Sequence, residues 1–540
     1  MLLALLISPL LHAASVEDTL RLRMETLTAL GGLDYGEDEV ISLGILPTFY
    51  DQRAYQAAWL EPDQVDNVIR LLENASTHGL DPQDYHLATI SKLRGDPNAT
   101  ADVDLLLTDG IVRYGYHLSF GKVDAAKLDS NWNFKRDLDG RDPATVLQAL
   151  ASNADVEQLW LSLPAFQKGP LYEALRGALA KYRRIADAGG WAQVPEGPTL
   201  RAGDTDPRIA SLRARLAAEG YLDSSPSTLF DEELALAAKA FQTNHGLDVD
   251  GAVGPGTLKA LNVPADARVD QIRLSLERLR WITESRVAGR NIIVNIANFT
   301  VYLLEDTDIV WSARAQVGRT YRQTPVFRAN LTYLEFNPTW TVPPGILRKD
   351  VLPAIWKDPT YLERKNMVVL DAKGNLIDAS TLNWDSYKNG RFPYMIRQRP
   401  GPWNALGRVK FIFPNSHFVF LHDTPSKSLF DRTSRSFSSG CIRVQNPFEL
   451  AEILLDDQPE WNEVSIQKLL DSGVTKRILP KKPLNVMMLY LTALTFDNGD
   501  TLEFFDDIYS RDAKLLEQLN EDFEFTPPDG LPDYMELGGL

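Results

Sequence analysis

Two short runs near the end of the chain decide how its last large domain folds: Phe418-Val419-Phe420-Leu421-His422-Asp423-Thr424-Pro425 and Ser438-Ser439-Gly440-Cys441-Ile442-Arg443-Val444. The first run alternates between two faces, as half-buried β-strands do, and the second resembles a strand returning beside it. The alternation puts His422 on the face of Phe418 and Phe420, and His417 on the opposite face. The pattern therefore predicts that Cys441 can meet His422 but not His417.

Cys441 is the one cysteine among 540 residues, which excludes an intrachain disulfide and any multi-cysteine metal site. Composition alone favours a buried, inert thiol, whereas the flanking residues favour a nucleophile. Gly440 lets a substrate or backbone approach closely, and the guanidinium of Arg443 is expected to lower the thiol pKa. The amides of Gly440 and Cys441 are candidate oxyanion donors, and His422 is the candidate base.

The overall composition narrows the classes of function. With 56 basic and 73 acidic residues, the formal net charge is −17, which argues against a nucleic-acid partner. No apolar run reaches the roughly 20 residues needed to span a bilayer, so membrane contact is expected to be peripheral at most. The seven histidines form no His-Glu-x-x-His pair, and no phosphate-binding glycine loop is present. We expect neither a metal nor a cofactor.

Working outward from the two runs, residues 285–496 are expected to form a mainly β domain. Alternation at Ile292, Val294 and Ile296 opens it, and a strand near Val486 to Phe496 closes it. A helix-rich, mixed insertion occupies about residues 348–399. Basic side chains in and after this insertion are candidates for binding substrate carboxylates or for a solvated surface: Arg397, Arg399, Arg408 and Lys410.

Helical patterns dominate the earlier parts of the chain. Residues 15–200 have apolar stripes typical of helices and read as a structural scaffold, ending in the Gly189-Gly190 and Pro195 to Pro198 breakers. Residues 201–265 read as a compact three-helix unit, in which Thr257 is expected to cap the last helix. His245 in this unit is expected to be a core or surface histidine, since it has no ligand partners nearby.

The two ends of the chain have unusual compositions. Residues 1–14 resemble an export signal, with a buried N-terminal helix as the alternative. From Asp497 onward there are 13 acidic and two basic residues. We expect residues 521–540 to be a solvated acidic tail.

The motifs around the thiol resemble the L,D-transpeptidase catalytic domain of the YkuD type. The match rests on His422-Asp423-Thr424-Pro425, Ser439-Gly440-Cys441-Ile442-Arg443, Val294-Asn295-Ile296, Thr324-Pro325, Asn337 to Pro343 and Gly401 to Gly407. Residues 201–265 resemble the peptidoglycan-binding domain type 1. Together with the helical scaffold and the insertion, the chain resembles the long periplasmic subgroup, which implies a multidomain α+β protein with a sandwich-like catalytic domain. Many relatives have histidine where this chain has Ser439.

The resemblance implies an acyltransferase that makes 3→3 peptidoglycan cross-links through a cysteine thioester on tetrapeptide stems. It implies catalytic roles for Cys441, His422, Gly440 and Asp423, with the imidazole oriented by a backbone carbonyl near Asp423. It makes four further residues candidates for substrate binding: Arg443, Ser439, Trp340 and Asn404. Trp403 is another candidate for the cleft, and the insertion would cover the cleft and exclude water.

The same resemblance implies a place and partners: the periplasm of a Gram-negative-type envelope, stem peptides as substrate, other cell-wall synthases as possible partners, a role in cell-wall biogenesis and cell shape, and carbapenems as acylating inhibitors. Two alternatives stay open. The same thioester can pass to water, giving an L,D-carboxypeptidase or a cross-link hydrolase. A non-catalytic wall-binding scaffold is the alternative from another class, and it predicts an unreactive Cys441.

Overall fold

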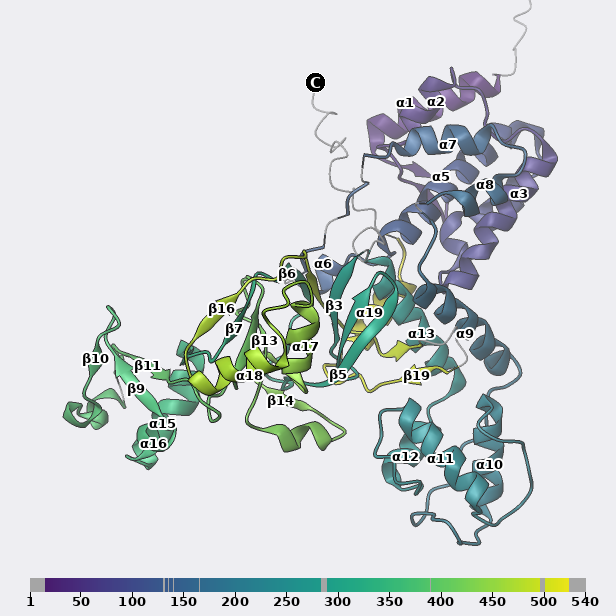
Figure 1. The fold of residues 1–540 in the computed structure, drawn as a ribbon. Helices are drawn as coiled ribbons and strands as arrows, with labels where there is room; N and C mark the ends of the chain where they lie inside the picture. Colours follow the sequence, from purple (N-terminus) through teal and green to yellow (C-terminus); the bar gives the residue numbers. More distant parts are fainter. Residues whose placement is uncertain are drawn as a thin grey trace, which may run out of the picture.

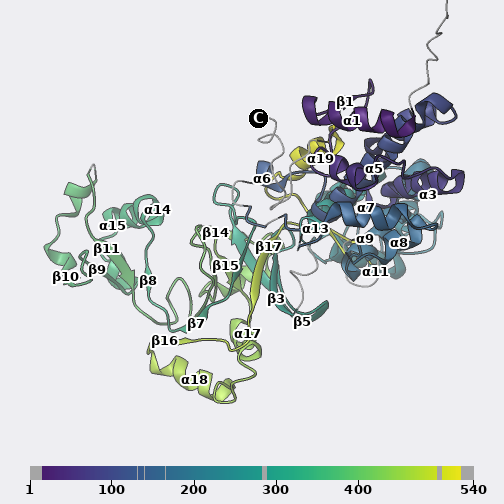
Figure 2. The same cartoon turned by 90° about the horizontal axis from the view of Figure 1, so that it is seen from above.

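The computed structural model describes residues 15–129, 132–134, 136–138, 140–164, 166–282, 289–388, 390–495 and 501–523. A helical N-terminal domain, a small helical module and a β-rich domain with an inserted cap follow one another along the chain (Figure 1). The cap lies on the side of the β-rich domain away from the N-terminal helices in both cartoon views (Figure 2). The predicted export signal and most of the predicted acidic tail lie outside the described residues.

The N-terminal domain is a scaffold of helices around α5. Its helices are α1 (Val16–Leu30), α2 (Leu46–Gln52), α3 (Pro62–Glu73), α4 (Leu87–Leu93), α5 (Thr100–Phe120), α6 (Ala125–Leu128), α7 (Pro143–Ala151), α8 (Val156–Ser162) and α9 (Pro170–Asp187), with a small hairpin of β1 (Leu33–Asp34) and β2 (Glu39–Val40). Helix α5 is buried almost all round, so its polar side chains need internal partners. Asp104, for example, accepts hydrogen bonds from the Tyr50 hydroxyl and from the backbone of Ala58 and Trp59.

The small module consists of α10 (Arg208–Glu219), α11 (Glu232–Asn244) and α12 (Pro255–Leu261). Helix α12 has Gly254 as its N-cap and Pro255 in its first turn, so the expectation that Thr257 caps it is wrong. Thr257 instead lies inside the helix, where its hydroxyl accepts a hydrogen bond from Gln242. His245 is a core residue: it stacks on Phe241 with 3.7 Å between ring centroids.

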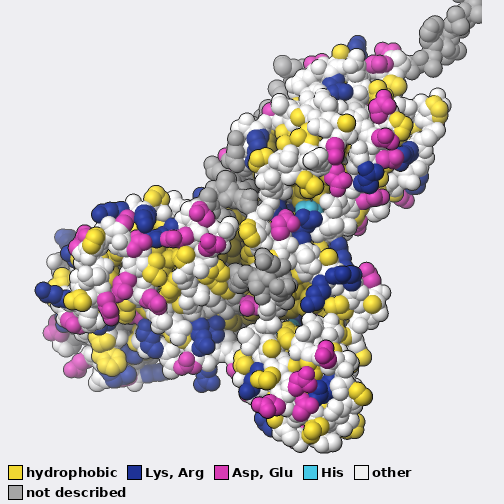
Figure 3. All heavy atoms as spheres, turned by 45° about the vertical axis from the view of Figure 1, so that its right-hand side comes forward, with side chains coloured by type: hydrophobic (Ala, Val, Ile, Leu, Met, Phe, Trp, Pro, Cys, Tyr) yellow, Lys and Arg dark blue, Asp and Glu magenta, His cyan; other side chains and the backbone are white. Residues whose placement is uncertain are grey.

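The module is docked onto its neighbours. The hydroxyl of Tyr182 in α9 donates to Glu219 of the module, a buried contact of 2.6 Å. His245 also faces Phe504, which belongs to the segment after the 11-stranded sheet of the β-rich domain. In the space-filling view, the module forms a lobe below the scaffold and the β-rich domain (Figure 3).

Helix α13 (Ala265–Arg280) connects the module to the β-rich domain and packs against α9 and α19 (Asp512–Asn520). Leu515 and Leu519 of α19 are buried in the hydrophobic core of the scaffold. Two short strands, β18 (Ala493–Leu494) and β19 (Glu503–Phe504), pair just before this helix. The acidic C-terminal stretch therefore includes a docked helix as far as Asn520. Of the tail predicted over residues 521–540, only residues 521–523 are described, and the ring of Phe523 packs against His117 with 4.3 Å between ring centroids.

The β-rich domain is built on one curled, mixed sheet of 11 strands, and its sandwich-like shape comes from that curl. The order is β16-β7-β12-β13-β15-β5-β4-β3-β17-β6, with β14 beside β5. The strands are β3 (Arg290–Asn295), β4 (Thr300–Glu305), β5 (Asp308–Gly318), β6 (Phe327–Asn330), β7 (Tyr333–Phe336), β12 (Val409–Ile412), β13 (Leu421–His422), β14 (Ser436–Ser438), β15 (Ile442–Val444), β16 (Lys476–Ile478) and β17 (Asn485–Leu489).

The core of this domain lies on one face of the sheet, where Val409, Phe411, Leu421, Ile442 and Val444 are buried together. Two helices contribute to the same core, α17 (Pro447–Leu454) and α18 (Glu463–Ser472). The last strand of the sheet ends at Leu489, earlier than the strand predicted to reach Phe496, because the chain leaves the sheet to form β18.

The cap is a small unit with its own four-stranded sheet of order β10-β9-β11-β8. Its elements are β8 (Trp340–Thr341), α14 (Pro344–Ile346), a π-helical turn (Leu347–Val351), α15 (Leu352–Lys357), α16 (Tyr361–Arg364), β9 (Met367–Leu370), β10 (Leu376–Ile377) and β11 (Met395–Gln398). The cap begins at Trp340 and not near Arg348, because β8 pairs with β11. A two-residue strand between prolines is too short for alternation to reveal.

Among the described helices, none combines the length and the hydropathy needed to cross a bilayer.

Candidate active site

A row of polar side chains crosses the sheet on the face opposite the core. The strand registers pair Glu335 with Lys410, Lys410 with His422, His422 with Arg443 and Arg443 with Gln316. Directly paired residues on neighbouring strands point to the same face of a sheet. The fold therefore places His422 between two cationic side chains, one on each neighbouring strand.

Cys441 lies on the same face, two residues before Arg443 at the start of β15. Because β13 and β15 are parallel neighbours, the thiol and the imidazole lie on adjacent strands, as the sequence predicted. The thiol is half-buried and lies 3.6 Å from the carbonyl oxygen of Phe418, to which it can donate.

The strand that ends at His422 is shorter than the sequence predicts. Phe418 has a left-handed backbone (φ +56°) and is 76% exposed, so the strand does not extend back to it, and β13 is only Leu421–His422. Alternation therefore does not set the direction of His417. Its ring packs instead against Phe327, with 5.0 Å between ring centroids.

The environment of the pair favours uncharged groups. Burial lowers the pKa of His422 to about 3, and the positive charge of Arg443 adds to this effect. Burial also raises the pKa of Cys441 above its usual value. A hydrogen bond from the Phe420 backbone and the charges of Lys410 and Arg443 act in the opposite direction but are outweighed. Arg443 thus lowers the thiol pKa, as expected, but burial outweighs it and the net pKa is raised, so the pair is a thiol beside a neutral imidazole.

The orientation of His422 is fixed by its own neighbour. Its Nδ1 donates to the backbone carbonyl oxygen of Asp423, the contact that the resemblance implies. Since Nδ1 carries the proton, Nε2 keeps the lone pair that a base requires. The carboxylate of Asp423 serves another purpose: it accepts the backbone N–H of Arg408 at 2.8 Å and forms an ion pair with Lys427.

The turn before the nucleophile is held by two hydroxyl groups. Ser438 Oγ accepts the N–H of Gly440 at 3.0 Å and donates to the carbonyl of Cys441. Thr324 Oγ1 donates to the carbonyl of Gly440 at 2.9 Å. The N–H of Gly440 is thus already engaged and is not an oxyanion donor in this conformation, contrary to the sequence expectation. Gly440 is required for its backbone, whose φ of +115° is one that other residues rarely adopt.

Support for this turn reaches it from the C-terminal segment. The hydroxyl of Tyr509 donates to the carbonyl of Gly318 at 2.6 Å and accepts the N–H of Thr324 at 3.2 Å. Thr324 Oγ1 in turn accepts the N–H of Gly318 at 2.9 Å. Sequence reasoning missed Tyr509, because nothing in its local pattern indicates partners 185 and 191 positions earlier in the chain.

Ser439, which occupies the position of the frequent histidine, is linked to the cap. Arg322 Nη1 donates to Ser439 Oγ at 2.9 Å and forms an ion pair with Asp350 of the cap, also at 2.9 Å. The hydroxyl therefore connects the nucleophile turn, through one guanidinium, to the base of the cap. Arg322 was not predicted, because its role depends on contacts between three separate segments.

Other predicted substrate-binding residues have structural partners. Asn404 is buried, and its amide donates to the carbonyls of Pro338 and Arg399, each at 3.0 Å. Trp340 packs against the hydrophobic core of the cap. Trp403 is 74% exposed. The structure does not bring these three residues into the polar row around Cys441.

Arg443 is the predicted binding residue that best keeps a free donor. Its Nη1 donates to Gln316 at 3.1 Å, while its buried Nε has no hydrogen-bond partner within the described part of the chain. Arg319 is close enough to lower the pKa of Arg443, and Lys410 lies on the other side of His422. The face around Cys441 is therefore positively charged.

Within the described ranges, no cluster of three or more His, Cys, Asp or Glu side chains is arranged to hold a metal ion.

Comparison with protein families divides the chain as the fold does. Residues 289–466 match the L,D-transpeptidase catalytic domain (YkuD), residues 205–261 the "Putative peptidoglycan binding domain", and residues 45–179 the "Scaffold domain".

Individual relatives agree with this division. The chain is 35% identical over 253 residues to the "Putative L,D-transpeptidase" of Haemophilus influenzae, a match over 47% of this chain and 50% of the relative. It is 40% identical over 76 residues to the N-acetylmuramoyl-L-alanine amidase CwlM of Mycobacterium tuberculosis, covering 12% of this chain and 19% of that one. The chain thus spans about half, or less, of the length of these curated relatives.

Solved structures give weaker similarity. An L,D-transpeptidase (Yku) from Stackebrandtia nassauensis is 13% identical, with a TM-score of 0.21, over 55% of this chain and 97% of that one. The L,D-transpeptidase (residues 123–326) from Xylanimonas cellulosilytica is 17% identical, with a TM-score of 0.18, over 54% of this chain and 99% of that one. Superpositions this poor carry no argument about the site.

Proposed function

We propose, for a chain that carries an L,D-transpeptidase catalytic domain beside a peptidoglycan-binding domain and a scaffold domain, that it forms 3→3 cross-links in peptidoglycan through a thioester on Cys441. The observation that carries the proposal is the pairing of β13 with β15, which brings the single thiol of the chain and a buried imidazole onto one face of the sheet. A nucleophile within reach of an oriented base is the arrangement that acyl transfer needs.

The first half-reaction forms the thioester. Sγ of Cys441 attacks the carbonyl carbon at the L-centre of diaminopimelate, the third residue of a tetrapeptide stem, while Nε2 of His422 takes the thiol proton. The bond to D-Ala then breaks, and D-Ala leaves as an amine carrying the proton from His422. Because the thiol and the imidazole start uncharged, attack and proton transfer are expected to be concerted.

The second half-reaction transfers the acyl group. The side-chain amine of a second stem attacks the thioester carbon, and His422 takes a proton from that amine. The carbon–sulfur bond breaks, and the proton returns to the sulfur of Cys441. The N–H of Cys441 has no hydrogen-bond partner within the described residues and is the candidate donor to the oxyanion in both steps.

The charges around the nucleophile fit the substrate proposed. Stem peptides carry carboxylates, and the side chains of Arg443, Lys410 and Arg319 give the face around Cys441 a positive potential. Arg443, with its free Nε, is the strongest candidate for binding a stem carboxylate. The cap is proposed to cover the stem and exclude water, which favours the amine as acceptor.

The location proposed for this activity is the periplasm, with other cell-wall synthases as candidate partners and with roles in cell-wall biogenesis and cell shape. The apolar start of the sequence and the peptidoglycan-binding domain support it.

Products from purified tetrapeptide muropeptides test the proposal by mass spectrometry. Transfer to an amine gives 3→3 dimers, whereas transfer to water gives tripeptides alone and would replace the proposal with an L,D-carboxypeptidase. Cys441→Ala should fold normally and give neither product, since no other thiol exists.

A carbapenem adduct in the intact-mass spectrum separates the enzyme from a wall-binding scaffold. We expect wild type to gain the mass of one carbapenem and Cys441→Ala to gain none. An unmodified wild-type protein after prolonged incubation would favour the non-catalytic scaffold.

A further inference from the structure

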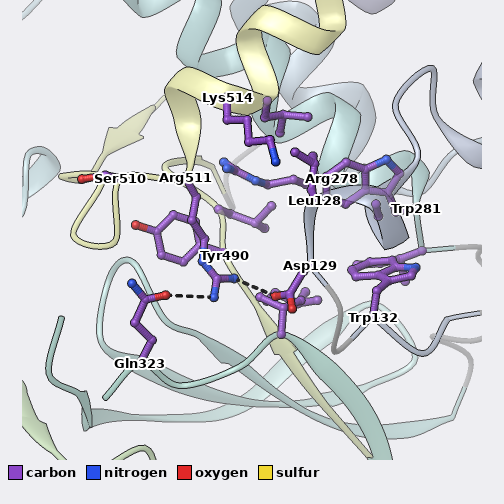
Figure 4. Close-up of a pocket in the computed structure, with 16 residues that line it drawn as sticks. Leu128, Asp129, Trp132, Arg278, Trp281, Gln323, Tyr490, Ser510, Arg511 and Lys514 are labelled. Carbon is purple, nitrogen blue, oxygen red and sulfur yellow. Dashed lines mark hydrogen bonds and ion pairs between the residues drawn. The ribbon is translucent and has the colours of Figure 1, made fainter. Parts of the chain in front are cut away.

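A cavity lies away from the face that holds Cys441, where the scaffold, α13, the sheet and the C-terminal segment meet. Its volume is about 400 Å³, within the range of small-molecule sites, roughly 300–1,000 Å³. Figure 4 shows side chains from four parts of the chain turned into it, among them Trp132, Arg278, Gln323 and Lys514. The family models that match the chain end before the C-terminal segment that forms one of its walls.

One side of this cavity holds a buried cation with an unused donor. Arg278 is only 6% exposed, and its Nη2 forms an ion pair of 2.6 Å with Asp512. Its Nη1 is buried and has no hydrogen-bond partner among the residues that the structure describes. An unsatisfied charged donor in a buried position is unfavourable unless a ligand or water fills its place.

A second cation lies on the same side. Lys514, on the neighbouring helix α19, extends toward the cavity near Arg278 in the close-up (Figure 4). Within the described part of the chain, its ammonium has neither an ion pair nor a hydrogen bond. Arg511, also in the wall, is by contrast satisfied by Asp129 at 3.3 Å and by Gln323 at 3.3 Å.

The charges of these groups leave one positive charge uncompensated. Asp512 balances Arg278 and Asp129 balances Arg511, so Lys514 remains without a counter-ion. A single carboxylate between Arg278 Nη1 and Lys514 Nζ would satisfy both donors and balance the site. Charge-assisted hydrogen bonds of this kind are among the stronger ones in proteins.

The rest of the cavity wall is mostly apolar and is suited to an uncharged part of a ligand. Leu128, Trp281, Ile282 and Leu489 line it, together with the ring of Trp132. Tryptophan offers a large flat surface that packs against aliphatic groups and against the apolar face of a sugar. The wall thus combines one anion-binding side with an apolar floor.

We propose that this cavity binds a small ligand with one carboxylate on an aliphatic or sugar body, its carboxylate held by Arg278 Nη1 and Lys514 Nζ. The site is separate from Cys441, although Gln323 links them: its side chain lines the cavity, and the next residue, Thr324, bonds to Gly440. The chemistry fits two sources, the carboxyl end of a short peptide and a carboxylated amino sugar.

Calorimetric titration of the full-length protein separates these sources. The probes are D-alanyl-D-alanine and N-acetylmuramic acid, and the matched uncharged controls are D-alanyl-D-alaninamide and N-acetylglucosamine. We expect at least one carboxylate probe to bind with a Kd below about 1 mM and its uncharged partner to bind at least fivefold more weakly. The proposal would be overturned if neither carboxylate probe bound at concentrations up to 5 mM. It would also be overturned if a carboxylate probe and its uncharged control bound with equal Kd.

Three variants locate the binding site. Lys514→Gln should raise the Kd of the carboxylate probe that binds at least fivefold. Lys468→Gln, the same change on the exposed surface of α18, should leave that Kd unchanged. Arg443→Gln should also leave the Kd unchanged, because it alters the nucleophile face and not this cavity. Binding that survives Lys514→Gln, or that is lost in Arg443→Gln, would refute the assignment without bearing on cross-linking, which is measured separately by muropeptide products.

Discussion

Thr324→Val tests whether the hydroxyl groups behind the nucleophile turn set its reactivity. Valine has nearly the same shape, but it removes the donor to the carbonyl of Gly440 and the acceptor of the N–H of Gly318. Thr324 is fully buried, and both backbone groups lie in buried residues, so water does not readily replace the lost partner. Leaving a buried group unsatisfied costs about 1–3 kcal/mol each, which gives roughly 2–6 kcal/mol in total for the two groups if the turn keeps its shape.

If about half of this loss falls on the position of Cys441, acylation should slow by roughly 5- to 150-fold, since 1.36 kcal/mol corresponds to a factor of ten. The assay is the rate of carbapenem adduct formation followed by intact mass, with thermal melting measured in parallel. Thr324→Ser, which keeps the hydroxyl, is the matched control and should acylate within about threefold of wild type. A valine variant that acylates as fast as wild type would show that this hydroxyl does not position the nucleophile.

Three further predictions concern the base, its titration and the module. His422→Ala should slow acylation roughly 100-fold or more, while His417→Ala should have little effect; equal losses would mean that the row around Cys441 is not the active site. Because the pKa of His422 is lowered to about 3, the base is already neutral at pH 5. Acylation rates at pH 5 and pH 7.5 should therefore agree within about twofold. If the base had an ordinary histidine pKa of about 6.5, the acylation rate would instead be about 30-fold lower at pH 5 than at pH 7.5. Deleting residues 206–263 should weaken sedimentation of the protein with intact sacculi. It should also lower the melting temperature, because it uncovers the hydroxyl of Tyr182 and the ring of Phe504. An unchanged melting curve would contradict the docking of the module described above.

The sequence was most informative where function depends on local pattern. Helix α3 follows from its apolar stripe, and the placement of Cys441 and His422 next to neighbouring strands follows from the two apolar runs around them. The family resemblance added the domain order and the carbonyl that orients His422. Each of these features involves residues close together in the sequence or repeated in a known motif.

What the sequence could not supply depends on register and long-range contact. The neighbours of His422 across the sheet are set by how β12, β13 and β15 align, and a shift of one residue would place different side chains beside it. Burial reverses the pKa argument for Cys441, because proximity to Arg443 is visible in the sequence but desolvation is not. The engagement of Gly440 N–H by Ser438 is likewise a matter of turn geometry.

The C-terminal stretch holds a helix that the sequence analysis does not assign. The acidic tail is predicted only from residue 521, and just before it Leu515 and Leu519 are four residues apart and form a short apolar stripe on α19. Charge summed over a long stretch hid this stripe, because the acidic residues lie on the other faces of the helix and in the segments around it.

The docking of α19 has a consequence for the order in which the protein is made. Ribosomes produce the scaffold first, but the helix that fills part of its core with Leu515 and Leu519 is among the last to be synthesised. Domains usually begin to fold during synthesis, so the core of the scaffold remains incomplete while the module and the sheet are synthesised. The same late segment carries Tyr509 to the turn behind Cys441. Chains cut short before this segment would therefore lack both a finished first domain and the support behind Cys441, which couples the proposed activity to completion of synthesis.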